Sequence, residues 1–174
     1  MRGRIFTINP NVQGENSVFQ SVTVMLSYSY YYWIQVGYLK GFQSPDPYVL
    51  TWYYEVRDLI DPQIKREWKG HPNAGSWYHY WIDKDKYTGV WTVEVSSEWT
   101  QSIGKRNPNL ARDYHAMSET TTPSIYIDGT WFQWLCTCGR PPDWDVWQRH
   151  IPKVDEPYHL LEVSHYEFKA WGGS

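Results

Sequence analysis

Apolar and polar residues alternate with a period of two through most of this chain, which is typical of β-strands with one buried face. The alternating segments are rich in β-branched and aromatic residues, which favour strands further. We predict strands at residues 18–27, 30–39, 48–57, 76–83, 90–98, 124–127, 130–134 and 160–171. Several short strands separated by turn residues are typical of a β-sandwich or a β-barrel.

Turn residues fall between these segments. Asp128-Gly129 predicts a tight hairpin between two of the strands, and further turns are expected at residues 44–47 and 84–89. Helical periodicity is limited to residues 58–68 and 110–117, each of which could hold a turn or two of helix. We therefore expect an all-β protein with little helix.

The length of 174 residues favours one domain spanning residues 1–174. We expect a short N-terminal arm, and a surface loop at about 139–157, where proline and tryptophan are frequent. The first four residues carry two arginines, but no long apolar stretch follows them. No signal peptide is therefore visible in this chain.

The charge and composition of the chain limit the kinds of partner it is expected to bind. The formal net charge of -3 gives no basic field for a phosphate backbone, so we expect no nucleic acid partner. No run of about 20 apolar residues occurs, so we expect no membrane span. The chain has 12 Trp and 15 Tyr, too many flat rings with polar handles for the core alone. Some of these rings should form a binding surface or an interface between copies, so a homo-oligomer is possible.

Cysteine and histidine give no clear metal site. Cys136 and Cys138 are one residue apart, which leaves two free thiols, a strained bridge or half of a metal site as open alternatives. The six histidines show no close ligand spacing. Serine hydrolase, phosphate-loop and dinucleotide-binding motifs do not occur either. We expect no metal and no cofactor.

Two predicted strands carry candidate chemistry. In the strand at 30–39, alternation places Trp33, Gln35 and Gly37 on one face, and the small glycine leaves room for a ligand beside the Gln35 amide. In the strand at 90–98, Glu94 and Glu98 should share the polar face. Four residues of extended strand separate their Cα atoms by about 13 Å.

Three sequence blocks resemble the glutamic peptidase superfamily of eqolisin and neprosin-like proteins. They are WIQVGY at 33–38, LTWYYE at 50–55 and SEWTQSIG at 97–104. The resemblance implies a concanavalin-like jelly-roll sandwich, a peptide ligand and an extracellular or cell-surface location. It further implies that Glu98 is the general base that activates water, while Gln35 stabilises the oxyanion. The expected substrate-binding residues are Trp33, Gly37, Trp52, Glu55 and Glu94.

Three other functions remain open. A glucanase-like glycosidase would use Glu94 and Glu98 as its carboxyl pair, with Ser96 where similar enzymes have an acid. A carbohydrate-binding module would bind a polysaccharide on exposed tryptophan rings without turnover. A structural surface protein would use the same rings for self-assembly.

Overall fold

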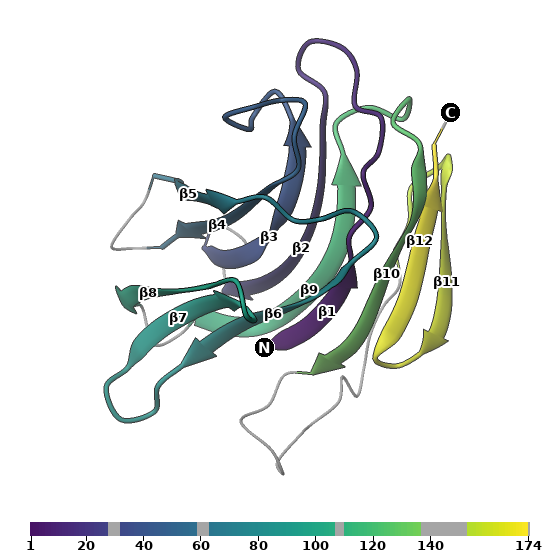
Figure 1. Cartoon of the computed structure of the whole chain (residues 1–174). Helices are drawn as coiled ribbons and strands as arrows, with labels where there is room; N and C mark the ends of the chain where they lie inside the picture. Colours follow the sequence, from purple (N-terminus) through teal and green to yellow (C-terminus); the bar gives the residue numbers. More distant parts are fainter. Residues whose placement is uncertain (28–31, 59–62, 107–109, 137–152, 174) are drawn as a thin grey trace.

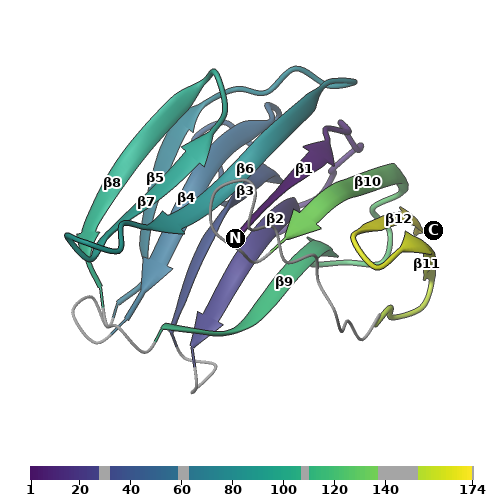
Figure 2. The same cartoon turned by 90° about the horizontal axis from the view of Figure 1, so that it is seen from below.

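The computed structural model describes residues 1–27, 32–58, 63–106, 110–136 and 153–173. These residues form two antiparallel β-sheets that lie face to face as a sandwich, and no helix occurs among them (Figures 1 and 2). The prediction of an all-β antiparallel sandwich is confirmed. Because the described part of the chain has no helix, it contains no helical segment long and apolar enough to cross a membrane.

Each sheet is built from strands distant in sequence. The seven-stranded sheet contains, in spatial order, β11 (Tyr158–Ser164), β12 (Glu167–Gly172), β10 (Ile127–Cys136), β1 (Arg2–Phe6), β6 (Trp77–Lys84), β7 (Val90–Val95) and β8 (Trp99–Lys105). The five-stranded sheet contains β5 (Lys65–Gly70), β4 (Thr51–Arg57), β3 (Trp33–Gly41), β2 (Val18–Ser27) and β9 (Leu110–Thr120).

The core lies between the two sheets and is rich in aromatic and aliphatic residues. One side chain in two along each central strand points into it, as the alternation predicts. Its largest fully buried members include Tyr38 and Tyr80, and their hydroxyl groups accept hydrogen bonds from the Ile8 backbone and from the Trp52 indole. Burying these rings therefore leaves neither phenol oxygen without a partner.

A second, smaller apolar cluster lies on the outer face of the five-stranded sheet. Val22, Leu39 and Tyr53 are fully buried there, with Trp33 and Trp68 packed against them. Residues of the same strands with the opposite parity point into the main core. This outer face is thus not an ordinary solvated surface, and it contains the candidate site described below.

The N-terminus differs from the arm predicted. Residues 2–6 form β1, which lies between β10 and β6 in the seven-stranded sheet (Figure 1). The amino group of Met1 donates a hydrogen bond of 2.7 Å to the Ile82 carbonyl. Because β1 has a neighbouring strand on each side, its backbone N–H and C=O groups are paired within the sheet. In a solvated arm, water would satisfy these groups instead.

The two segments given helical periodicity are strands instead. Lys65–Gly70 is the edge strand β5, and Leu110–Thr120 is the edge strand β9. Both pair along their length with a strand of the five-stranded sheet, and this tertiary pairing overrides a weak local preference. Residues 59–62 of the first segment lie outside the described residues.

Several predicted strand ends also shift. Asp128-Gly129 makes no hairpin, because residues 127–136 form one continuous strand in which Gly129, with φ 84°, lies at a register shift against β12. Residues 158–172 form a hairpin of two strands rather than one strand. The strand predicted at 90–98 ends at Val95, and Ser96 to Glu98 form a tight turn.

Candidate functional site

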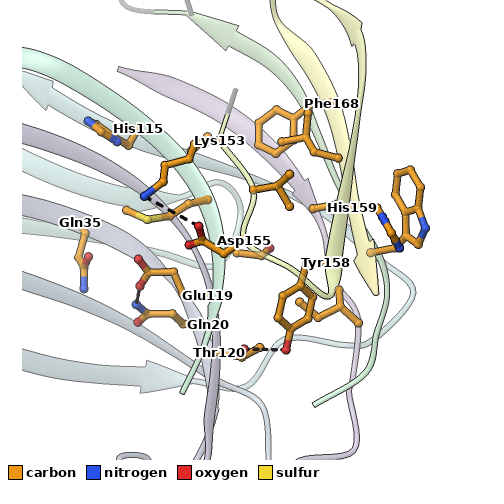
Figure 3. Close-up of a pocket in the computed structure, with 18 of the residues that line it drawn as sticks. Gln20, Gln35, His115, Glu119, Thr120, Lys153, Asp155, Tyr158, His159 and Phe168 are labelled. Atoms are coloured by element: carbon orange, nitrogen blue, oxygen red, sulfur yellow. Dashed lines mark hydrogen bonds and ion pairs between the residues drawn. The ribbon is translucent and has the colours of Figure 1, made fainter. Parts of the chain in front are cut away.

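The outer face of the five-stranded sheet borders a cavity of about 1030 Å³ that extends over β9 to the β11–β12 hairpin (Figure 3). We call this surface the groove face and define it by six side chains. They are Gln20, Trp33, Gln35, Glu55, Arg66 and Glu119. They come from all five strands of the sheet, so pairing of distant segments is required to assemble them.

Strand register explains why these side chains share one face. Gln35 pairs with Glu55, and Glu55 pairs with Arg66 across the next ladder. On the other side, Gln20 pairs with Glu119. Residues directly opposite one another in neighbouring strands point to the same face of a sheet, so Gln35, Glu55 and Arg66 form a polar row on it. Gln20 lies opposite Leu39 of β3, so its pair with Glu119 lies on the same face but outside this row.

The carboxylate of Glu55 is the centre of the first polar network. It accepts a hydrogen bond of 2.8 Å from the Trp33 indole and one of 2.7 Å from the Arg66 Nε. A second guanidinium nitrogen of Arg66 lies 2.6 Å from it. The Glu55 side chain is only 4% exposed, and its charge is balanced by Arg66. This carboxylate therefore orients the indole and the guanidinium.

A second network runs from β3 and β4 to β2 and β9. The Gln35 amide donates to the Tyr53 hydroxyl at 3.2 Å, and that hydroxyl donates to the Gln20 carbonyl oxygen at 2.6 Å. The Gln20 amide then donates to the Glu119 carboxylate at 2.5 Å. Burial raises the pKa of Tyr53 well above its usual value, and the nearby Glu55 charge adds to this effect. The Tyr53 phenol therefore stays protonated and can donate to Gln20. This sets the donor and acceptor of each hydrogen bond from Gln35 to Glu119.

Aromatic rings flank the polar row. Trp33 and Trp68 are partly exposed on this face, and the ring of Trp68 lies 5.9 Å from that of Tyr53. The guanidinium of Arg66 lies over the rings of Tyr53 and Trp68, at 5.4 Å and 5.6 Å from their centres. Stacked cations and hydrogen bonds together hold these rings in place.

The far side of the cavity is formed by the C-terminal hairpin and the segment before it. Figure 3 shows Tyr158 and Phe168 across the cavity from Gln20 and Glu119. The Tyr158 hydroxyl bonds the Thr120 hydroxyl at 2.8 Å, which ties the hairpin to β9. The cavity wall is therefore braced from both sheets.

Four residues named from the sequence lie on the groove-face side of their strands: Trp33, Gln35, Gly37 and Glu55. Gly37 approaches the neighbouring strand closely, since a Cβ there would lie 2.1 Å from the Ser21 carbonyl oxygen. Its lack of a side chain therefore serves strand pairing.

Trp52 lies on the opposite face of β4, inside the main core. Its indole donates to the Tyr80 hydroxyl at 3.2 Å, and its ring meets Tyr78 edge-on at 4.9 Å. The residue is buried between the sheets and does not border the cavity.

Glu94 and Glu98 belong to the other sheet. Glu98 is exposed in the turn between β7 and β8, while Glu94 lies on the outer face of β7 beside Trp81. The structure thus brings neither carboxylate to Gln35. The predicted alternation of Glu94 and Glu98 along one strand is also wrong, because β7 ends at Val95.

Sequence reasoning missed half of the site. Gln20, Arg66 and Glu119 were not singled out, and neither was Tyr53. Tyr53 was within reach, because alternation along residues 51–57 places it on the same face as Glu55. Arg66 and Glu119 lie on the two edge strands. Because residues 58–68 were predicted as helical, no strand face was assigned to Arg66.

Other candidate chemistry is limited in the described residues. They contain no group of three or more His, Cys, Asp or Glu side chains that could hold a metal ion. Cys136 is a buried free thiol whose sulfur accepts a hydrogen bond from the Arg2 Nε, and Cys138 lies outside the described residues. Residues 139–152 of the surface loop predicted at about 139–157 lie outside them too.

Comparison of the chain with protein-family models, with curated proteins and with solved structures gives no match. The arguments for function therefore come from the geometry of the site.

Proposed function

We propose that this protein is a carbohydrate-binding β-sandwich whose groove face holds a neutral oligosaccharide. The observation that supports this most is a row of amide, carboxylate and guanidinium groups, held in place by hydrogen bonds, between the rings of Trp33 and Trp68. A sugar ring binds to both polar groups and aromatic rings, because its hydroxyl groups form hydrogen bonds while its C–H face stacks on flat rings.

The groove face is organised before any ligand arrives. The polar side chains hold one another through two networks, one centred on Glu55 and one on Tyr53. Binding would therefore freeze few rotamers, which favours affinity at low entropic cost. This suits a ligand that offers many weak hydroxyl contacts.

The size and charge of the groove favour a neutral oligosaccharide. Small-molecule pockets have volumes of about 300–1,000 Å³. The cavity here, about 1030 Å³, lies just above that range and suits several linked rings. Within the polar row, Arg66 balances the charge of Glu55. The other charged side chains of the lining are mostly acidic, namely Glu119, Asp155, Glu156, Glu162 and Glu167 against Lys153, and this disfavours an anionic ligand relative to a neutral one.

Binding is supported better than hydrolysis. A glutamic peptidase mechanism needs a carboxylate near Gln35 that can take a proton from water. The neighbouring carboxylate, Glu55, is engaged by an arginine and an indole, and Glu98 lies in a turn of the other sheet. The Gln35 amide also already donates to a phenol.

The direct test is a titration of the full chain with neutral hexasaccharides of glucose, xylose and mannose in different linkages. Binding is followed by the indole N–H signals of Trp33 and Trp68 in NMR spectra. We expect at least one hexasaccharide to shift both signals. Replacing Gln20 by Ala or Trp68 by Ala should weaken that binding about tenfold, because each removes a polar or a stacking contact.

The matched control is Gln13→Ala, which removes an exposed amide that does not border the cavity. It should bind as the wild type does. A panel that moves neither indole, or a folded Gln20→Ala variant with unchanged affinity, would rule out binding at the groove face. Cleavage of a peptide substrate that requires Glu98 but not Gln20 would instead support the peptidase expected from the sequence.

A further inference from the structure

A second cluster of rings and cations lies on the outer face of the seven-stranded sheet, on the opposite side of the sandwich from the groove face. The guanidinium carbon of Arg4 lies 4.2 Å from the ring centre of Trp77 and 4.1 Å from that of Trp134. We call these three residues the Arg4 clamp. They come from β1, β6 and β10, which are adjacent strands (Figure 1).

The clamp fixes the plane of the guanidinium. Rings lie against Arg4 at close range, and its Nε donates to the Gln133 side chain at 3.0 Å. Within the described residues, no Asp or Glu oxygen lies within 4.0 Å of its nitrogens. A planar fork without a carboxylate partner matches the geometry of a carboxylate or sulfate group.

Charges around the clamp agree with this. The cross-strand neighbours of Arg4 are Gln133 and His79, and neither is an anion. One acid is connected to Arg4 through Gln133. It is Glu167, whose carboxylate accepts a hydrogen bond of 2.7 Å from the Gln133 amide. Burial lowers the pKa of His79, and the positive charges of Arg4 and Arg2 lower it further.

A β-bulge at Trp134 directs its ring toward the clamp. Its φ is 56°, in the left-handed region that a bulky residue rarely adopts, and it lies at the register shift between β10 and β1. The strained backbone places a ring that is 49% exposed over the Arg4 guanidinium. Bulges of this kind are frequent next to binding sites, where they redirect a side chain.

We propose that the Arg4 clamp is a second binding site, which takes the oxyanion of an acidic saccharide on its guanidinium and the sugar ring on Trp134. Trp131, whose ring lies 5.9 Å from that of Trp77, extends the aromatic surface for a neighbouring sugar. This site does not depend on the groove face, and it differs from it in ligand charge.

The experiment titrates the full chain with four probes of similar length. They are an oligogalacturonate, a sulfated oligosaccharide, a neutral oligosaccharide and a poly-glutamate peptide. Indole N–H signals are assigned, so that shifts at Trp77 and Trp134 report the clamp while shifts at Trp33 and Trp68 report the groove. We expect an acidic saccharide to move the first pair, with affinity that falls as salt rises.

The variants separate the fork from simple charge. Arg4→Gln should weaken binding of the acidic saccharide about tenfold, and Arg4→Lys should recover only part of it, because lysine has no fork. Lys86→Gln removes a cation stacked on Tyr87 in an exposed turn, and should leave the affinity unchanged. Trp134→Ala should weaken binding several-fold.

Each outcome decides the proposal. A carboxylated or a sulfated ligand that binds in an Arg4-dependent way supports it and identifies the preferred oxyanion. It is overturned if no acidic saccharide moves Trp77 and Trp134, if folded Arg4→Gln binds unchanged, or if poly-glutamate binds there more tightly. Should both Arg4 variants fail to fold, the wild-type shifts and the affinity of Trp134→Ala distinguish the same outcomes.

Discussion

The two outer faces of the sandwich use the same residue types in different electrostatic settings. On the groove face, Arg66 stacks over Tyr53 and Trp68 and contacts the carboxylate of Glu55. On the opposite face, Arg4 stacks on two tryptophans and bonds a neutral Gln133. One arginine is neutralised and the other is not, so similar aromatic surfaces favour neutral and anionic ligands respectively.

Strand pairing produces this difference. Arg66 lies opposite Glu55 on β4, whereas Arg4 lies opposite Gln133 and His79. Directly opposite side chains on one face are within interaction distance, so the neighbouring strand decides whether a cation finds a carboxylate. The charge of each face therefore depends on which strands pair.

The largest expected effect tests how tightly each sheet is built. A Cβ at Gly37 would lie 2.1 Å from a backbone oxygen, whereas a Cβ at Gly3 would meet the end of the Leu135 side chain at 2.6 Å. We expect Gly37→Ala to lower the free energy of unfolding by about 4 kcal/mol or to prevent folding. Gly3→Ala should cost about 1–2 kcal/mol, because a side chain can move. Urea unfolding of both variants measures this, and equal costs would contradict it.

The next effect makes the groove face resemble the other face. Glu55→Gln removes the charge that balances Arg66, and breaking a buried ion pair costs ~3–5 kcal/mol. We expect about 2 kcal/mol of destabilisation in urea, below that range because the Arg66 side chain is 24% exposed.

The same variant has a binding readout and a control. The freed Arg66 should give the groove measurable affinity for an acidic saccharide, detected at the Trp68 indole. The control is Gln133→Ala beside Arg4, which removes no charge and should cost less than about 1 kcal/mol. Equal stability losses in the two variants would show that the Glu55 charge does not matter.

Alkaline pH tests whether the groove face excludes water as the core does. Burial raises the pKa of Tyr80 in the core and of Tyr53 on the groove face well above 10. A raised pKa means that the stability is full below pH 10 and is lost as pH rises toward the folded pKa, because unfolded tyrosines ionise first.

Each buried phenol that stays protonated should cost about 1 kcal/mol of stability between pH 10 and pH 11. Urea unfolding against pH, together with tyrosinate absorbance, gives the measurement. Early ionisation of Tyr53 in the folded protein, seen as a signal that Tyr53→Phe removes, would show that water reaches the groove network.

The smallest effect concerns the strained backbone at Trp134, with Trp131 as the matched position on the same strand. At Trp134, whose φ is positive, Trp134→Gly should be more stable than Trp134→Ala by about 1 kcal/mol. At Trp131, in ordinary strand conformation, alanine should be the more stable replacement. The same order at both positions in thermal unfolding would mean that Trp134 carries no strain.

Much of the fold could be predicted because alternation is local. The pattern at 18–27 matches β2, and the parity of residues 33–38 correctly separates Trp33 and Gln35 from the core residues Ile34 and Val36. The edge strands were harder to predict. β5 and β9 have weak local preferences, and their partners in the sheet decide their conformation.

The candidate site was predictable only within single strands. Trp33, Gln35 and Gly37 come from one segment, and their shared face follows from the period of two. Glu98 did not join them, because it lies in the turn between β7 and β8, and both of these strands belong to the other sheet. Nothing local indicated that Arg66 would lie against Glu55 or that Glu119 would bond Gln20.

By itself, the sequence determined that most of this chain forms β-strands and which side chains of the strongly alternating segments share a face, because both follow from backbone geometry over a few residues. The tertiary structure alone decided the order of strands in each sheet, and with it the neutral groove and the Arg4 clamp. The physical reason is that backbone hydrogen bonds between strands are the same for any pair. The choice of neighbour depends on how side chains from the whole chain pack together.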